Sequence, residues 1–177
     1  GVFAKGRDDA ARKAVALSKG QAMEEEAPFQ APAALLEAAK ALAPGQKYIR
    51  GLYCGGTLAS EALYEIAKEC SPVYSNVAKK PEQKMKDLAV SEAHTIIDLG
   101  DDAFTVGRPH PMIEPELRND RLLAEALDPE TAVVLLDFEL GYGSHEDPAG
   151  VALVAIRAAQ GKNPAAGRKG LFAGCYR

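Results

Sequence analysis

Three strand–loop–helix units follow one another along the chain, and this repetition limits the possible folds more than any other feature. Each unit starts with an apolar run, crosses a polar or glycine-rich loop, and ends in residues whose apolar members recur at helical spacing. The run TAVVLLDF at 131–138 contains an unbroken Val-Val-Leu-Leu, which is typical of a parallel strand buried on both faces. The repetition predicts an α/β domain built on an open, doubly wound parallel sheet.

The expected elements of this sheet domain can be placed from their apolar spacing and their turn residues. The polar stretch 71–92, broken by Pro72 and Pro81, is expected to be an exposed excursion with a short helical turn near 81–88. The expected strands cover 48–54, 94–99, 131–138 and 169–176, and the expected helices cover 59–70, 115–127 and 151–161.

The first quarter of the chain has a different texture and is predicted to be a helical segment, residues 1–45, before a domain at 46–177. It could be the tail of a preceding domain, and the start at Gly1 and the last strand at the end indicate a fragment of a longer protein. Its expected parts are a short strand at 1–6, a helix capped by Asp8 or Asp9, a connector at 24–32 and a helix at 32–45.

Composition excludes several classes of function. A net charge of −4, with no basic run longer than two residues, argues against a nucleic-acid surface. No apolar stretch approaches the ~20 residues of a membrane helix, and no signal peptide is visible. The three cysteines lack metal-type spacing and are odd in number, which favours a reduced, cytoplasmic protein without a metal site.

The first and third loops of the sheet domain carry glycines ahead of a helix. Gly55 and Gly56 let backbone amides approach an anion at a helix N-terminus, although a tight turn capped by Thr57 explains the same residues equally well. In the third loop, Gly141 and Gly143 precede a helix that Asp147 is expected to cap, and these glycines form a second anion-binding candidate.

The second loop, between His94 and Pro115, combines carboxylates, an arginine and a histidine within a proline-rich segment. Asp98 and Asp101 could hold a cation or a substrate amine, Arg108 could bind a carboxylate or phosphate, and His110 could act as acid, base or nucleophile. The alternative is that the aspartates cap turns and pair with Arg108.

Together the three loops predict a site at the carboxyl edge of the sheet for a small anionic substrate. Cys54, beside the first glycine turn, is predicted to be a small buried residue, and His145 a solvated loop residue. The expected catalytic residues are Arg108, His110 and Asp98, and the expected phosphate- or substrate-binding residues are Gly55, Gly56, Thr57, Gly100, Asp101, Gly107, Gly141, Gly143 and Ser144.

Three segments, YIRGLYCGGTLASEAL, HTIIDLGDDAFTVGRPHPMIEPELRND and VVLLDFELGYGSHEDPAG, resemble the FdrA family, whose members are similar to the alpha and beta subunits of succinyl-CoA synthetase. The resemblance covers about 46–160. It implies a flavodoxin-like CoA-ligase domain that follows a CoA-binding domain or meets partner subunits, in an oligomer. CoA and ATP would serve the full-length enzyme, and neither is assigned to this chain.

The resemblance implies an acyl-CoA synthetase component that binds phosphate or an acyl phosphate at the glycine loops. Succinyl-CoA synthetases phosphorylate a histidine in a GHAGA-like loop, which this sequence lacks, so phosphohistidine chemistry is not carried over. The alternatives are a subunit of an oxamate carbamoyltransferase in ureide catabolism, in which Arg108 would hold the oxamate carboxylate, and a non-catalytic assembly domain.

Overall fold

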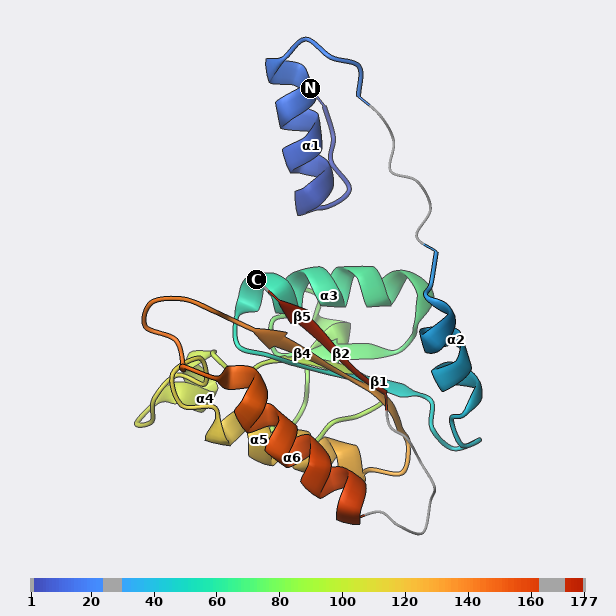
Figure 1. The fold of residues 1–177 in the computed structure, drawn as a ribbon, viewed down its shortest axis with the longest axis vertical. Helices are drawn as coiled ribbons and strands as arrows, with labels where there is room; N and C mark the ends of the chain where they lie inside the picture. The colour runs from blue at the N-terminus through green and yellow to red at the C-terminus, as the bar shows by residue number, and fades with distance from the viewer. Residues whose placement is uncertain (1, 24–29, 163–170, 177) are drawn as a thin grey trace. The chain divides into compact units, whose positions relative to one another are not determined.

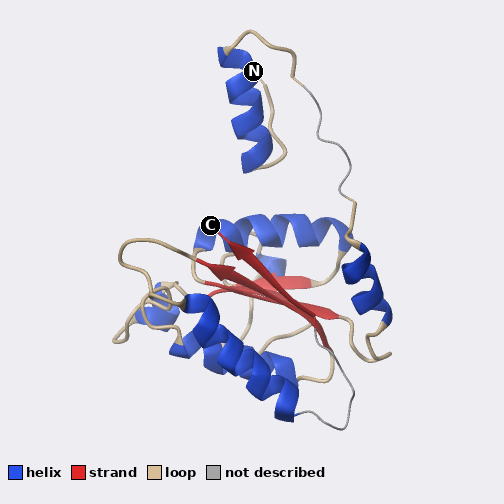
Figure 2. Cartoon of the chain, in the orientation of Figure 1, coloured by secondary structure: helices blue, strands red, loops and turns tan. Residues whose placement is uncertain are grey.

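The computed structural model describes residues 2–23, 30–162 and 171–176. The chain divides into two compact units, residues 1–36 and 37–177, and each is described by itself. Figures 1 and 2 show the ribbon by chain position and by secondary structure. The elements are α1 (Arg7–Ser18), α2 (Ala33–Lys40), β1 (Tyr48–Tyr53), α3 (Gly56–Glu69), β2 (Val73–Ser75), η1 (Pro81–Gln83), β3 (His94–Asp98), α4 (Asp102–Thr105), α5 (Glu116–Leu127), β4 (Thr131–Phe138), α6 (Pro148–Lys162) and β5 (Leu171–Tyr176).

The second unit is built on a five-stranded sheet in the order β2-β3-β1-β4-β5, and every pair in it is parallel. In Figure 1, α3 lies on one face of the sheet, and α5 and α6 lie on the other. This is the predicted doubly wound α/β fold of the flavodoxin-like type. β2 and β3 lie on one side of β1, and β4 and β5 lie on the other side. The order in which strands are added to the sheet therefore reverses between β1 and β4. Such sheets bind ligands at this switch point.

Consecutive strand residues point to opposite faces, so each strand contributes to two cores. Leu52 and Ile97 pack with Leu122 on the face covered by α5 and α6, whereas Tyr53 and Ile96 pack against the face covered by α3. Because both faces are covered by helices, neighbouring strand residues such as Ile96 and Ile97 are both apolar, in place of an alternation of apolar and polar residues.

The predicted elements of the sheet domain are present, with two additions and shifted ends. The excursion at 71–92 contains the edge strand β2, which pairs with β3, and the expected helical turn is η1. The short helix α4 was not predicted either; Asp101 caps it by accepting a hydrogen bond from the Ala103 amide at 2.9 Å. Asp147 and Pro148 open α6 as predicted, with the Asp147 carboxylate accepting from the Gly150 amide at 2.8 Å.

In the first unit, two predictions were wrong. Residues 2–6 form no strand, because they turn directly into α1, whose N-cap is Gly6 rather than Asp8 or Asp9. Asp9 instead lies inside the helix, where its carboxylate accepts from the Lys5 amide at 2.8 Å and pairs with Lys13. Most of the expected connector, residues 24–29, lies outside the described residues.

Candidate active site

The turn from β1 into α3 consists of Cys54, Gly55 and Gly56. It lies at the carboxyl edge of the sheet where β1 and β4 end, which is called the β1/β4 edge below. Gly55 is the N-cap of α3 and supplies no side chain to the helix N-terminus. The Cys54 amide is held by both carboxylate oxygens of Asp137, at 2.9 and 3.1 Å. Burial raises the pKa of the Cys54 thiol to about 12, so it is an inert buried residue, as predicted.

Three carboxyl groups from neighbouring strand ends surround this turn. A Cβ placed on Gly56 would lie 3.0 Å from an Asp98 oxygen, and one on Gly55 would lie 3.2 Å from a Glu139 oxygen. Burial raises the pKa of Asp98 and of Glu139 above their ordinary values, and it raises the pKa of Asp137 to about 6. Glu139 Oε2 is buried and has no hydrogen-bond partner among the described residues.

Arg118 brings a buried guanidinium from α5 to the same edge. Its Nη1 donates to the Asp137 carbonyl at 2.7 Å and to Cys54 Sγ at 3.3 Å, and lies 3.9 Å from the Asp137 carboxylate. Its Nε and Nη2 are buried without an acceptor in the part of the chain that the structure describes. Unused donors alone do not set Arg118 apart, because the buried Nη1 of Arg50 also lacks an acceptor among the described residues. Arg118 differs in that the carboxylate paired with it lies as far away as 3.9 Å.

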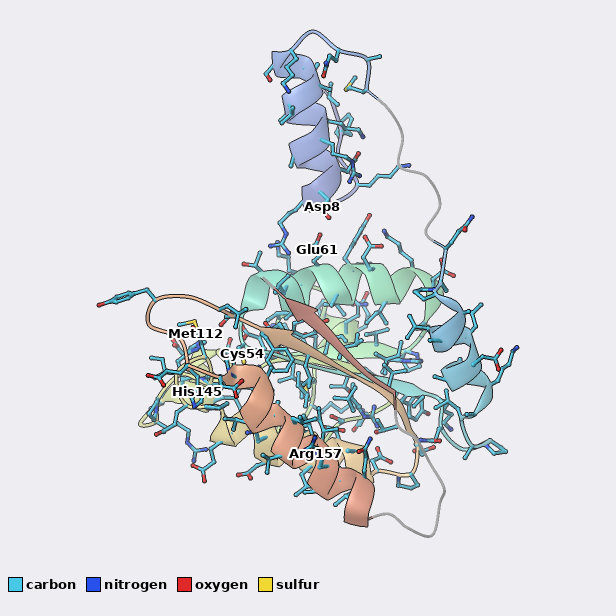
Figure 3. The ribbon with its side chains drawn as sticks, viewed as in Figure 1. Asp8, Cys54, Glu61, Met112, His145 and Arg157 are labelled. Atoms are coloured by element: carbon cyan, nitrogen blue, oxygen red, sulfur yellow. The ribbon has the colours of Figure 1, made fainter. Side chains whose placement is uncertain are left out.

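The second loop packs onto the third beside this turn. The Asp98 carboxylate accepts from the Gly100 amide at 2.9 Å, and the His110 ring lies against Gly100 with its Nδ1 accepting from the Met112 amide at 3.2 Å. The His145 amide donates to the Met112 carbonyl at 2.9 Å and joins the two loops. Figure 3 shows Met112, His145 and Cys54 at the same end of the domain.

The structure brings together only part of the predicted site. Gly55, Gly56, Asp98, Gly100 and His110 gather at the β1/β4 edge or directly beside it. The other predicted residues lie farther out: Thr57, Gly107, Arg108, Gly141 and Gly143 are exposed, Asp101 caps α4, and the Ser144 hydroxyl donates to the Gly141 carbonyl at 2.7 Å.

Sequence reasoning missed Arg118, Asp137 and Glu139. Asp137 lies near the end of β4, and Glu139 directly follows this strand. Ligand-binding residues occur at this position in such sheets. Arg118 lies four residues before Leu122, which is fully buried, so it falls on the inward face of α5. That spacing was the available signal for a buried arginine.

Comparison with known proteins fits this geometry. A family model described as CoA-ligase matches residues 52–168, which include all three strand-end loops. The chain belongs to the CoA-ligase family. Within it, the chain is similar to the uncharacterized protein YahF of Escherichia coli (strain K12), with 45% identity over 167 residues, 94% of this chain and 32% of YahF. The chain thus spans about a third of the length of this relative.

Two features are absent from the residues that the structure describes. No helix within the described residues is long and apolar enough to span a membrane. Across residues 2–23, 30–162 and 171–176, no group of three or more histidine, cysteine, aspartate or glutamate side chains is arranged to hold a metal ion.

Proposed function

We propose that this CoA-ligase domain is a component of an acyl-CoA synthetase similar to succinyl-CoA synthetase, and that it binds phosphate or an acyl phosphate at the β1–α3 turn. The supporting observation is the convergence, at one sheet edge, of the α3 N-terminus, the buried Arg118 guanidinium and carboxyl groups with raised pKa values. Helix amides and a guanidinium are the donors that phosphate oxygens accept from.

The carboxyl groups set a condition on such a ligand. With Asp98, Asp137 and Glu139 all ionised, the edge would carry more negative than positive charge and would repel an anion. Because burial already raises the pKa of all three, a bound anion raises them further, and the site takes up protons with its ligand. A protonated carboxyl group then becomes a hydrogen-bond donor to the phosphate.

The exposed predicted residues keep a role at the rim of this proposed site. Arg108 lies on the solvent side of the second loop, where it would neutralise charge on a substrate that enters from the solvent. The Gly141–Ser144 turn belongs to the third loop, which the His145 amide joins to the second. CoA and ATP, which an acyl-CoA synthetase uses, are assigned to none of the residues of this site.

Phosphate binding by the chain itself tests the proposal. Titration of the ¹⁵N-labelled chain with inorganic phosphate should shift the amide signals of residues 55–58. Gly56→Ala, which places a methyl group 3.0 Å from the Asp98 carboxylate, should weaken this binding. Gly45→Ala is the matched control, because its nearest neighbour, the Pro129 carbonyl, would lie 3.9 Å away. Unchanged signals at residues 55–58 would contradict the proposal and favour a non-catalytic assembly domain.

The ligase activity belongs to the full-length protein and is tested there. With ATP, CoA and a panel of carboxylic acids, the full-length protein should release ADP or phosphate and form an acyl-CoA. No release with any acid of the panel would contradict a ligase role.

A second candidate is a subunit of an FdrA-type oxamate carbamoyltransferase. The hydrogen bonds of the two loop histidines favour it. Each uses its Nδ1 as an acceptor for a backbone amide of its own loop, Met112 for His110 and Asp147 for His145. Neither lies in the GHAGA-like loop of a phosphohistidine enzyme. Carbamoyl transfer needs no phosphohistidine: phosphate attacks the carbamoyl carbon of oxalurate, and oxamate leaves as carbamoyl phosphate forms. Absence of both products with the full-length protein and its partner subunits would exclude this candidate.

A further inference from the structure

A groove of about 430 Å³ lies between α3 and the segment 77–83, and the residues that line it do not include those of the glycine turn. Its first wall is α3, with the buried Leu63 and with Tyr64 and Lys68. Its second wall includes Val77, Lys79 and Lys80. The volume lies within the ~300–1,000 Å³ typical of small-molecule sites.

The second wall is held in place by hydrogen bonds to the sheet. The Asn76 side chain donates to the Asp98 carbonyl at 3.0 Å and accepts from the Asp98 amide at 2.9 Å. Ala78 is buried, and the Val77 amide donates to the Ser75 hydroxyl at 3.2 Å. The groove is therefore a fixed feature of the fold and not a gap beside a loose loop.

The groove combines an apolar floor with positive charge in a chain whose net charge is −4. Leu63 and Val77 supply apolar surface, and the Tyr64 side chain is 57% exposed. Neither Lys79 nor Lys80 has an ion-pair partner within the described residues, whereas Lys68 pairs with Glu65 at 2.6 Å and lies 4.3 Å from the Tyr64 ring centroid.

We propose that this groove binds a nucleotide, with its base against Tyr64 and the apolar floor and its phosphates between Lys79 and Lys80. Aromatic side chains accept any base by stacking, and unpaired ammonium groups attract phosphate. The groove starts beside the β1–α3 turn, since a Cβ on Gly56 would lie 3.9 Å from Val77. The proposal does not depend on phosphate binding at that turn.

Titration of the ¹⁵N-labelled 177-residue chain with ADP tests the proposal. Amide signals of residues 60–68 and 77–80 should shift, whereas shifts confined to residues 55–58 would report the turn and overturn the groove. Adenosine and inorganic pyrophosphate, which each lack one half of ADP, should bind more weakly than ADP. Pyrophosphate that binds as tightly as ADP would overturn the proposal, because lysines alone would then explain binding.

Variants separate the two halves of the groove. Lys79→Ala with Lys80→Ala should weaken ADP binding roughly tenfold or more, because two phosphate contacts are lost. Lys84→Ala with Lys86→Ala removes the same charge just after the segment 77–83, from residues that do not line the groove, and should change the Kd by less than about twofold. Tyr64→Ala should weaken binding at least roughly fivefold, and Tyr64→Phe should restore it. Equal losses in the two lysine pairs would contradict the proposal.

Discussion

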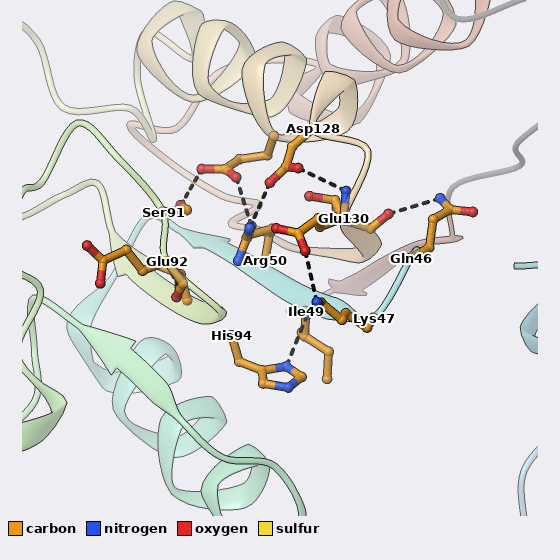
Figure 4. Close-up of polar contacts among 12 residues, drawn as sticks. Gln46, Lys47, Ile49, Arg50, Ser91, Glu92, His94, Asp128 and Glu130 are labelled. Carbon is orange, nitrogen blue, oxygen red and sulfur yellow. Dashed lines mark hydrogen bonds and ion pairs between the residues drawn. The ribbon is translucent and has the colours of Figure 1, made fainter. Parts of the chain in front are cut away.

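The two ends of the sheet each bury one arginine, and the two arginines are partnered differently. At the amino end, Arg50 of β1 pairs through Nε with Glu125 at 3.0 Å and through Nη2 with Asp128 at 2.8 Å (Figure 4). At the carboxyl end, the only ion-pair partner of Arg118 among the described residues is the Asp137 carboxylate, at 3.9 Å. Both arginine side chains are 2% exposed, so burial does not explain the difference.

This difference separates a structural end of the sheet from a binding end. Arg50 belongs to a matched network, in which Arg121 also pairs with Glu125 and ties it to the 88–91 segment. Unmatched buried charge costs stability, and proteins tend to retain it where a ligand completes the balance. The pKa values of the aspartates beside the two arginines differ in the same sense. Burial would raise the pKa of Asp128, but the Glu130 amide and Arg50 lower it, whereas burial raises that of Asp137.

The largest expected effect comes from breaking the matched end. Arg50→Met should lower the free energy of unfolding by about 3 kcal/mol, because it leaves the partly buried Asp128 without a guanidinium and the buried Glu125 with Arg121 alone. Urea unfolding followed by circular dichroism measures this. Lys40→Met, which breaks the exposed Lys40–Glu37 pair, should cost less than about 1 kcal/mol. Equal losses of unfolding free energy in the two variants would contradict a structural role for the Arg50 network at the amino end of the sheet.

The second test uses pH, because the two ends respond in opposite directions. Folding raises the pKa of Asp137 from 3.8 to about 6, so its protonation stabilises the fold fully below pH 3.8. This contribution, ~3 kcal/mol, is lost as the pH rises to about 6. Asp137→Asn should therefore flatten the fall in unfolding free energy across this window.

Asp128→Asn is the matched control for the pH test. The lowered pKa of Asp128 means that its stabilisation is present above pH 3.8 and lost as the pH falls below that value. This variant should lose stability near neutral pH and keep the fall that Asp137 causes. The same pH profile in both variants would contradict the assignment of opposite roles.

The third test adds a methyl group to the binding end. A Cβ at Gly100 would collide with His110 Nε2 and lie 2.9 Å from the Cys54 carbonyl oxygen, a backbone atom that cannot move freely. Gly100→Ala should therefore cost about 1–3 kcal/mol of unfolding free energy, the usual cost of overpacking. Thermal unfolding measures it against Gly45→Ala. A Gly100→Ala variant as stable as this control would show that the loops at this end are free to move.

The smallest expected effect concerns Arg108, the exposed arginine of the second loop. Arg108→Ala should weaken sulfate binding by less than about 1 kcal/mol, because solvent screens an exposed guanidinium. Isothermal titration at low and moderate salt measures the change. A loss of about 1.5–3 kcal/mol would instead indicate a direct charge-assisted contact from Arg108.

The sequence predicted the sheet because its strands are buried on both faces and carry unbroken apolar stretches, such as Val-Val-Leu-Leu within 131–138. It also located the strand-end loops, since glycines and a capping aspartate mark where strands give way to helices. The edge strand β2 was missed because three residues between Pro72 and Asn76 carry too short a pattern. Its pairing with β3 is a tertiary contact that local spacing cannot encode.

The charges of the site were harder to predict than its position. Arg108 has the more conspicuous sequence context, among prolines in a loop, yet Arg118 is the buried one. The spacing of Arg118 to Leu122 indicates a position on the inward face of α5, but the contacts of Arg118 with Cys54 and Asp137 are tertiary contacts that local spacing cannot encode. In the same way, the raised pKa of Asp137 arises from burial that only the folded chain creates.

Sulfate binding at two pH values tests the central claim most directly, because sulfate itself does not titrate between pH 5.5 and 8. If the β1/β4 edge binds an anion with uptake of protons by Asp137 and Glu139, sulfate should shift the amide signals of residues 55–58. It should also bind several-fold more tightly at pH 5.5 than at pH 8. Arg118→Met should abolish this binding, and Arg108→Ala should retain it. Sulfate that leaves residues 55–58 unaffected, or that binds them equally at both pH values, would contradict the account.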